Sequence, residues 1–508
     1  MNPSILGSDS VGVGMSLRSR FGGKLAVLAA FLTLVLLWTG CGDIFRPVAI
    51  PIVQPGGDPQ REHHTLVVSS NGSNPGSAVI IDVSGDTNVA TFTGNNNGVG
   101  RNPVYATSSG VTDFAINRDD NSVSSFLLPT VPNQLNRPNL ISLPAPTPAD
   151  PTITPAVPVF AAVAQANLYV AARGRNSVFL IPNGATAWSL EIPVGNNPTA
   201  LVATPDGTQL FCLNNGSNNV SVILPANNTV FTTIPVGASP VWGAASSDST
   251  RVFIVNQGDS TVSVIDTTTE TVVNTLPVGA GPNYIVYDPT LNRAYVTSPA
   301  GNSLSIIENA TATAPMAPPT VVSTAAAPCN AVSPISVTAL ADGTRAYVAD
   351  QVTNNICVLS TVSNTFIRAV SVGSAPTTTS GIVADPDSTR VHAASSATLP
   401  IASISRSNNE VTVTTSGSNP FIAGQIVVIA GVADITYTGS FIIDSVLSPT
   451  QFTYSQSGPA TASSGGTATV GYVSIIQTSN DTLVTESDGI TPLTISTVGT
   501  PTFITLTP

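Results

Sequence analysis

The chain has 508 residues, which is enough to bury a large hydrophobic core, and only 9% of its residues are charged. Its formal net charge is −12 and Lys24 is its only lysine, so it lacks the basic footprint on which nucleic-acid binding depends. The 40 glycines and 41 prolines are typical of a turn-rich β protein, and the composition fits a protein outside the cytoplasm.

The N-terminus has the pattern of a secretion signal. Basic residues precede an apolar run over residues 25–37, which is too short to span a membrane comfortably and fits the core of a signal peptide. The run ends in Leu37-Trp-Thr-Gly-Cys41, which resembles a lipobox, the motif whose cysteine receives a diacylglyceryl group. We predict a signal peptide over residues 1–40 and lipidation of Cys41. Ordinary signal cleavage and an uncleaved anchor are the alternatives.

Residues 41–62 contain four prolines and predict a semi-extended tether between the lipid and the folded part of the chain. Gly42 follows the cysteine, which favours the outer membrane in a cell that has one. The expected location is the cell envelope, at the outer membrane or the cell surface, with a periplasm-facing position as the variant. The membrane is then a partner through the lipid anchor.

A repeat of constant length follows the tether. Its clearest marks are three Pro-Val-Gly segments whose glycines follow one another by 42 residues, at Gly195, Gly237 and Gly279. Each period holds four short runs of β-branched and aromatic residues separated by Gly, Asn, Asp and Ser, as antiparallel strands and tight turns require. A period of about 40 to 45 residues with four strands is typical of a propeller blade. Because a blade cannot bury both faces of its sheet alone, the repeat predicts an all-β propeller around a central channel.

The repeat occupies residues 63–403 and returns over residues 471–508. It predicts eight blades, with seven as the alternative if a degenerate early unit does not form. Lettering the strands of a blade a to d in chain order, the first unit (residues 66–94) shows strands b, c and d but lacks strand a. The C-terminal segment, residues 500–508, has the form of a strand a. We expect it to complete the first blade and close the ring, which hides the sheet edges.

One long interruption separates strands b and c of the last blade. Residues 404–470 contain four or five further strand patterns and predict a small β domain inserted at a loop tip. The segment resembles small β modules of phage tail and bacterial surface proteins, notably over residues 424–431 and 438–441. Three alternatives remain for this segment, which are a lid, an adhesive module and an insertion without a function.

Several repeat segments resemble a known family. Arg293-Ala-Tyr-Val-Thr-Ser298, Arg345-Ala-Tyr-Val-Ala-Asp350 and Thr204-Pro-Asp-Gly-Thr208 are similar to the Tyr-Val-Thr-Asn (YVTN) β-propeller repeats of bacterial and archaeal cell-envelope proteins. The resemblance spans most of residues 66–400 and resumes after about residue 472. It implies the propeller fold, whereas function varies among such proteins, which serve as binding platforms, surface-layer components and sometimes enzymes.

Three further cysteines lie in the repeat. Cys329 is in the loop before strand a of its blade, and Cys357 is at the start of strand c of the same blade; the corresponding loops of a propeller share one face. The pair is either a disulfide, which an envelope compartment permits, or two buried free thiols. Cys212, within a strand b, is expected to be a core residue.

The titratable residues show no pattern that is typical of a catalytic or metal site. The histidines are His63, His64 and His392, and the first two are expected to be solvated at the end of the tether. No Cys or His spacing is typical of zinc, and we find no Gly-rich phosphate loop and no nucleophile elbow with a plausible partner. We therefore predict no catalytic residue, no metal site and no cofactor.

Two other sets of residues are interpreted as structural. Trp188 and Trp242 are expected to pack in the core or at the rim, rather than to form a sugar platform. Acids recur at the a-to-b turn, where an aspartate caps the turn. These acids are Asp206, Asp248, Asp342 and Asp387.

Two functions remain. The first is a non-enzymatic binding or scaffolding module of the cell envelope, whose partner is a protein, a glycan or a surface polymer bound by the loop-rich face. The second is a propeller-type hydrolase, similar to lactonases, acting in the periplasm or at the cell surface. A hydrolase needs acids or histidines that converge on the channel. Because such groups are few in this chain, the binding module is favoured over the enzyme.

Overall fold

The computed structural model describes residues 64–72, 74–82, 87–93, 98–127, 137–311, 316–373, 377–486 and 488–507. All of them belong to one compact unit, Val53–Pro508. The described part contains strands and one short 3-10 helix, and it has no helix long and apolar enough to cross a membrane. The predicted signal peptide, Cys41, the tether and His63 lie outside the described residues.

Seven four-stranded antiparallel sheets each form one blade. The strands of these blades, from the innermost outward, have the following bounds: β38 (Thr500–Thr507), β1 (His64–Asn71), β2 (Asn74–Asp82) and β3 (Thr87–Phe92); β4 (Pro103–Ser109), β5 (Thr112–Asn117), β6 (Ser122–Leu127) and β7 (Asn139–Ser142); β8 (Pro158–Ala164), β9 (Asn167–Ala172), β10 (Ser177–Ile181) and β11 (Leu190–Pro193); β12 (Pro198–Ala203), β13 (Leu210–Asn214), β14 (Asn219–Leu224) and β15 (Thr229–Pro235); β16 (Pro240–Ala245), β17 (Arg251–Asn256), β18 (Thr261–Asp266) and β19 (Thr271–Pro277); β20 (Tyr284–Asp288), β21 (Arg293–Ser298), β22 (Ser303–Ile307) and β23 (Thr320–Ser323); β24 (Pro334–Ala339), β25 (Arg345–Asp350), β26 (Asn355–Ser360) and β27 (Thr365–Ser371).

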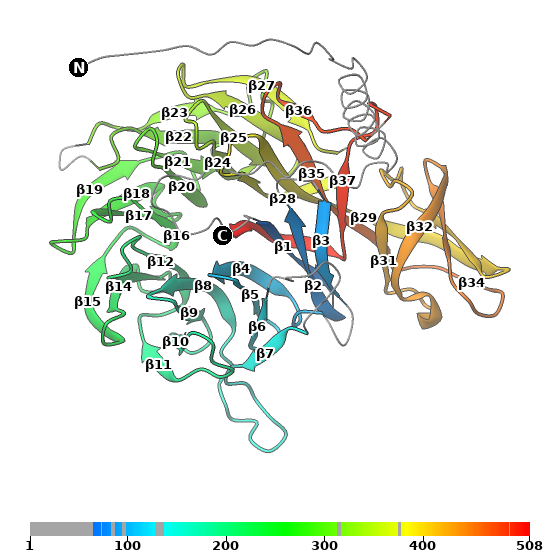
Figure 1. Cartoon of the computed structure of the whole chain (residues 1–508), viewed down its shortest axis with the longest axis horizontal. Helices are drawn as coiled ribbons and strands as arrows, with labels where there is room; N and C mark the ends of the chain where they lie inside the picture. The colour runs from blue at the N-terminus through cyan, green and yellow to red at the C-terminus, as the bar shows by residue number, and fades with distance from the viewer. Residues whose placement is uncertain are drawn as a thin grey trace, which may run out of the picture. The chain divides into compact units, whose positions relative to one another are not determined.

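A ten-stranded sheet fills the remaining place in the ring. Its propeller part consists of β28 (Thr377–Ala384), part of β29 (Arg390–Ser407), part of β35 (Thr467–Gln477), β36 (Thr482–Leu483) and β37 (Thr494–Thr497). The innermost strands contact one another in the cyclic order β38, β4, β8, β12, β16, β20, β24 and β28 (Figure 1). Seven blades are thus separate four-stranded sheets, which is the predicted alternative, and the eighth predicted repeat belongs to a sheet that also builds the inserted domain.

The C-terminal segment closes the ring, as predicted. Strand β38 pairs antiparallel with β1, in a register that joins His64 to Thr507 at one end and Ser70 to Thr500 at the other. Figure 1 shows the red C-terminal strand beside the blue strands of the first blade. The first blade is therefore built from both ends of the described chain.

The inserted domain is a closed six-stranded barrel. Its strands, in the order of pairing, are the remainder of β29, β30 (Glu410–Thr415), β33 (Gln451–Ser455), β32 (Gly439–Ser448), β31 (Ile426–Ala430) and the start of β35. A short strand β34 (Thr461–Ser463) pairs with β29, and the 3-10 helix η1 (Ile435–Tyr437) lies in the β31–β32 connection. The predicted insertion between strands b and c is confirmed, but positions 404 and 470 fall inside β29 and β35, because blade and barrel share these strands.

A close contact explains the glycine of the repeated Pro-Val-Gly. A Cβ atom on Gly237 would lie 2.6 Å from Asn256 Nδ2, and one on Gly195 would lie 2.7 Å from Asn214 Cγ. Asn256 is buried at the end of its strand b and donates from Nδ2 to Ser263 Oγ at 2.9 Å. The glycine is required wherever this buried asparagine recurs, because any larger residue would displace the amide from its hydrogen bonds.

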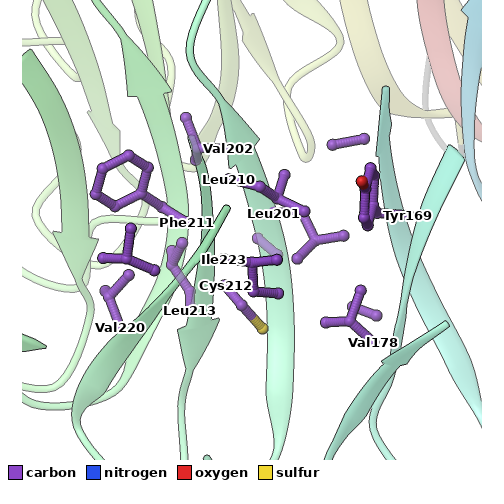
Figure 2. Close-up of a cluster of buried hydrophobic side chains, with 14 of the residues drawn as sticks. Tyr169, Val178, Leu201, Val202, Leu210, Phe211, Cys212, Leu213, Val220 and Ile223 are labelled. Carbon is purple, nitrogen blue, oxygen red and sulfur yellow. The ribbon is translucent and has the colours of Figure 1, made fainter. Parts of the chain in front are cut away.

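Neighbouring blades interlock through apolar side chains. Figure 2 shows the cluster between the β8–β11 and β12–β15 blades, with Tyr169 and Val178 on one side and Leu201 among the residues of the other. Tyr169 also donates its hydroxyl to Asn228 Oδ1 of the next blade at 2.6 Å. Cys212 is a fully buried free thiol within this cluster, as predicted.

Buried titratable groups flank the first blade. Asp113 shares its face of β5 with Ala115, which packs against the first blade, and neither Asp113 oxygen has a hydrogen-bond partner among the described residues. On the other flank, His392 Nδ1 lies 3.1 Å from Asp385 Oδ1 and 3.3 Å from Thr65 Oγ1 in β1. Later repeats place Leu, Val or Ala at the Asp113 position, and most of the others place Phe or Tyr at the His392 position.

We expect the closing strand to contribute strongly to stability. Ile504 is 6% exposed and packs between the first and last blades, so Ile504→Ala should lower the free energy of unfolding by about 2–5 kcal/mol. Deletion of residues 500–508 should cause a larger loss and aggregation, because it exposes an edge of β1. The measurement is urea and thermal unfolding. Ile435→Ala, at an 81% exposed residue, is the control and should change stability by less than about 0.5 kcal/mol. An unchanged midpoint after the deletion would contradict closure by this strand.

Asp113 predicts a pH dependence of stability. Burial raises the pKa of its carboxyl to about 7, above the value of about 4 in the unfolded chain. The protonated carboxyl is the form that is compatible with the folded state. Its contribution to stability is fully present below pH 4 and is lost as the pH rises through 7. The free energy of unfolding should therefore fall, between pH 4 and pH 8, by on the order of 4 kcal/mol more in the wild type than in Asp113→Asn, which cannot ionise. Urea unfolding of both proteins across this range measures the difference, and parallel pH profiles would refute the assignment.

Candidate binding site in the axial channel

The innermost strands share a bulge close to their start. In the β12–β13 pair, Pro198 is opposite Asn214 whereas Ala200 is opposite Leu213, so the register slips by one residue. The same slip occurs near the start of six other innermost strands. Proline is accommodated there because a bulge leaves a backbone donor without a ladder partner. The bulge sets the direction of the side chain that follows it, which lies toward the channel.

The residue after the bulge is aromatic in most blades. Tyr284 holds the same place in its blade, two residues after Pro282. The aromatic residues at this position are Tyr105, Phe160, Trp242, Tyr284 and Phe503. Small residues hold it in the other three blades, and these are Ala200, Ser336 and Gly381.

The five rings form one continuous cluster across the channel. Tyr105 stacks on Phe160 with centroids 3.8 Å apart and lies 4.4 Å from Phe503. Trp242 lies 5.1 Å from Phe160 and 4.8 Å from Tyr284. Each such pair contributes about 0.5–1.5 kcal/mol beyond the burial of its surface. The aromatic layer therefore contributes to the stability of the folded structure.

A cavity opens where two neighbouring blades carry small residues in this layer. Ser336 and Gly381 follow one another around the ring between Tyr284 and Phe503, and a cavity of about 220 Å³ lies among these four residues and Trp242. Its other lining residues come from the same innermost strands or the loops before them and are Asn283, Ile335, Ser380, Ile382 and Ile504. The cavity thus lies where two neighbouring blades lack the aromatic residue.

A second cavity of about 350 Å³ lies further along the channel. It is lined by later residues of the innermost strands, such as Ala203, Thr338 and Thr505, and it also touches Trp242 and Phe503. The aromatic layer therefore forms a boundary that both cavities share.

Hydrogen bonds from side chains hold the cavity wall in place. Asn283 Nδ2 donates to the carbonyl of Ile335 in the next blade at 2.9 Å, and its Oδ1 accepts from Thr297 at 2.8 Å. Thr199 donates to the carbonyl of Pro240, which ties another pair of neighbouring blades in the same way. The Asn283 amide is thus committed to the framework, and the wall retains the hydroxyl groups of Ser336, Ser380 and Tyr284.

The tyrosines of the channel are neutral at physiological pH. Burial raises the pKa of Tyr284 to about 12, and a hydrogen bond to Ser336 opposes this rise. Burial also raises the pKa of Tyr105 above its ordinary value. Both hydroxyl groups therefore remain protonated and can donate hydrogen bonds.

The structure links Cys329 to Cys357 in a disulfide with Cα atoms 5.0 Å apart. Both cysteines are fully buried, within the blade that also carries Ser336. The disulfide joins the loop before β24 to β26, and so ties the start of this innermost strand to its blade.

The prediction for His64 is wrong. It is 8% exposed, because the pairing of β1 with β38 draws it into the first blade, where its carbonyl accepts from Thr507 Oγ1 at 3.0 Å. His392 is buried at the seam with the first blade rather than in the channel. No group of three or more His, Cys, Asp or Glu residues among the described positions is arranged to hold a metal ion.

The acids of the a-to-b turn have the predicted capping role. Asp206 Oδ1 accepts from the backbone N–H of Thr208 at 3.0 Å, and Asp342 Oδ1 accepts from that of Thr344 at 2.9 Å. Asp248 and Asp387 make the equivalent bonds.

The two tryptophans differ from each other. Trp188 packs edge-on against Phe179 at 5.0 Å, in agreement with its prediction as a packing residue. Trp242 packs too, but in the aromatic layer of the channel, where it is partly exposed to the cavity. Its prediction as a packing residue also holds, because it packs against the hydrophobic clusters of two neighbouring blade pairs. The signal that places it was present in the sequence, as an aromatic residue two positions after a repeated proline.

No protein-family model matches the chain, and no curated protein matches it in sequence. Several solved structures are similar to parts of this chain. AztD from Citrobacter koseri is 12% identical, with 87% of this chain and 97% of that chain covered and a TM-score of 0.48. A candidate 6-phosphogluconolactonase from Bacteroides fragilis is 15% identical, with 61% and 95% covered and a TM-score of 0.47. Virginiamycin B lyase from Staphylococcus aureus is 15% identical, with 57% and 90% covered and a TM-score of 0.44. At these scores the similarity carries no argument about function.

Proposed function

We propose that this chain is a non-enzymatic binding module of the cell envelope, with the axial cavity as its ligand site. The observation that carries the proposal is the gap in the aromatic layer at Ser336 and Gly381. Five of the eight equivalent positions hold aromatic rings, and the two adjacent small residues leave a cavity beside three of these rings. Concave sites lined by aromatic side chains and a few polar groups are typical of ligand binding.

The framework around the cavity supports the proposal. The innermost strands are paired within their blades, and side chains such as Asn283 bond them to the neighbouring blade. A site on paired strands keeps its shape without ligand, which reduces the ordering cost of binding.

The alternative is a lactonase-like hydrolase, which needs a group that transfers protons at the reacting atoms. The described residues that line the two cavities are aromatic, aliphatic, hydroxyl or amide residues and glycine. The His392–Asp385 pair at 3.1 Å lies at a blade seam instead. No observation in the described part favours the hydrolase over binding, so it is retained as an outcome of the test below.

We also propose that the module is held at the envelope by a lipid on Cys41, with residues 41–62 as the tether, in the manner of YVTN-type surface proteins. The signal-like N-terminus and the lipobox-like Leu37–Cys41 support this proposal.

The anchor has a direct test. Wild-type protein should incorporate labelled palmitate and fractionate with membranes, whereas Cys41→Ser should take up no label and keep its signal segment. Cys212→Ser, which changes a buried core thiol, is the matched control and should be labelled like the wild type. Wild-type protein without lipid label would refute the anchor.

The binding function is tested by filling the cavity with the aromatic residue that most blades carry at this position. Ser336→Phe places an aromatic ring where five other blades have one. It should lower the affinity for the insoluble envelope fraction of the source cell, in co-sedimentation, by about tenfold or more. Val362→Phe, at a 91% exposed residue of the same blade, adds the same ring outside the cavity and should bind like the wild type. Trp242→Leu is a second variant in case Ser336→Phe does not fold, as judged by its thermal midpoint.

Equal binding by the wild type and both cavity variants would refute the site. Turnover of a lactone panel by the wild type, lost in Ser336→Phe, would favour the hydrolase.

A further inference from the structure

We propose that the axial cavity binds one uncharged pyranose ring, the terminal sugar of an envelope glycan. This inference rests on the proposed binding function and specifies its ligand. It is drawn from the size of the cavity, the arrangement of its aromatic and hydroxyl groups, and the aromatic boundary at its inner end.

The size of the cavity selects a single ring. Its volume is about 220 Å³. Sites for drug-sized ligands are larger, at about 300–1,000 Å³. A hexose ring with its hydroxyl groups matches the smaller volume, whereas a disaccharide or a peptide segment exceeds it.

The lining has two kinds of surface that match the two kinds of surface on a sugar. Trp242, Tyr284 and Phe503 offer aromatic faces and edges, with Trp242 and Tyr284 only 4.8 Å apart and inclined by 40°. The electron-rich face of an aromatic ring attracts the C–H groups on the apolar face of a pyranose. The hydroxyl groups of Ser336 and Ser380 lie in the same lining and can exchange hydrogen bonds with the rim of the sugar.

The combination of aromatic and hydroxyl groups in the cavity disfavours two other classes of ligand. A purely apolar ring would bury the Ser336 and Ser380 hydroxyl groups without replacing their hydrogen bonds to water, which costs binding free energy. An anionic sugar would enter a cavity whose described lining residues include no Lys, Arg or His. The burial that raises the pKa of Tyr284 to about 12 reports an environment that disfavours charge.

The aromatic layer selects the end of a glycan rather than its middle. Trp242, Tyr284 and Phe503 line both axial cavities and so form the boundary between them. The stacked rings of Tyr105 and Phe160 continue this layer. Because these rings occupy the channel beside the cavity, we expect a sugar to enter as a terminal unit or as a free monosaccharide.

The experiment is a titration of the purified full-length protein with methyl glycosides of glucose, galactose, mannose and N-acetylglucosamine. Binding is followed by tryptophan fluorescence in Trp188→Phe, which leaves Trp242 as the only tryptophan after residue 38. At least one neutral glycoside should saturate the signal with a Kd of about 1 mM, as expected for a ligand of this size. A glycan that ends in the same sugar should bind at least as well as the methyl glycoside. This comparison distinguishes a terminal sugar of a glycan from a free monosaccharide as the ligand.

Matched variants and ligands decide the outcome. Ser336→Phe and Trp242→Leu should weaken binding by about tenfold or more, measured by saturation-transfer NMR, and Val362→Phe should leave it unchanged. Glucuronate and galacturonate should bind about tenfold more weakly than the neutral sugars. No saturable response to any neutral glycoside, a response that Ser336→Phe retains, or tighter binding of phenol would each overturn the sugar assignment. If the protein still co-sediments with the envelope fraction in a Ser336-dependent manner, only the sugar is wrong; if it does not, the proposed function falls with it.

Discussion

The pairing of the C-terminal strand with the first strand is the interaction on which the rest of the structure depends. The Thr502 hydroxyl on β38 lies within hydrogen-bond distance of the main-chain carbonyls of Val68 in β1 and Pro103 in β4, so one residue reaches two blades. The same strand carries Phe503 and Ile504 into the axial cavity. Closing the ring therefore also completes the candidate site, because an open ring would lack one of the three aromatic residues that line it.

Buried titratable groups lie on both sides of the first blade. At the equivalent positions of later seams, Leu, Val or Ala pack without polar atoms, whereas this blade meets the Asp113 carboxyl on one side. On its other side, Thr65 contacts the buried His392. A buried carboxyl without a hydrogen-bond partner is destabilising when ionised, so the extensive pairing of β38 and β1 has to offset it. The pairing of β38 with β1 thus stabilises the closed ring, whereas the buried polar groups at these seams destabilise it.

The sequence predicts the blades well because their determinants are local. In two of the three Pro-Val-Gly segments the glycine lies beside a buried asparagine, and the capping acids depend on hydrogen bonds to a residue two positions on. The face on which Trp242 lies was not predictable from alternation, because the bulge after Pro240 shifts the strand by one residue and inverts the pattern. The burial of His64 was also missed, because it arises from pairing with a strand more than four hundred residues away.

The inserted barrel shows a further limit of local patterns. Its strand patterns suggest a self-contained domain, yet the β29–β35 ladder runs without a break from Arg390–Gln477 in the blade to Pro400–Thr467 in the barrel. Near its start, β35 pairs on its other side with β31, so the barrel closes on a strand that belongs to the propeller. The entry and exit of the insertion are therefore set by the register of a ladder and not by a flexible loop. That ladder continues through the β28–β29 pairing to Gly381, so the blade that carries the barrel is also the blade whose missing side chain opens the cavity.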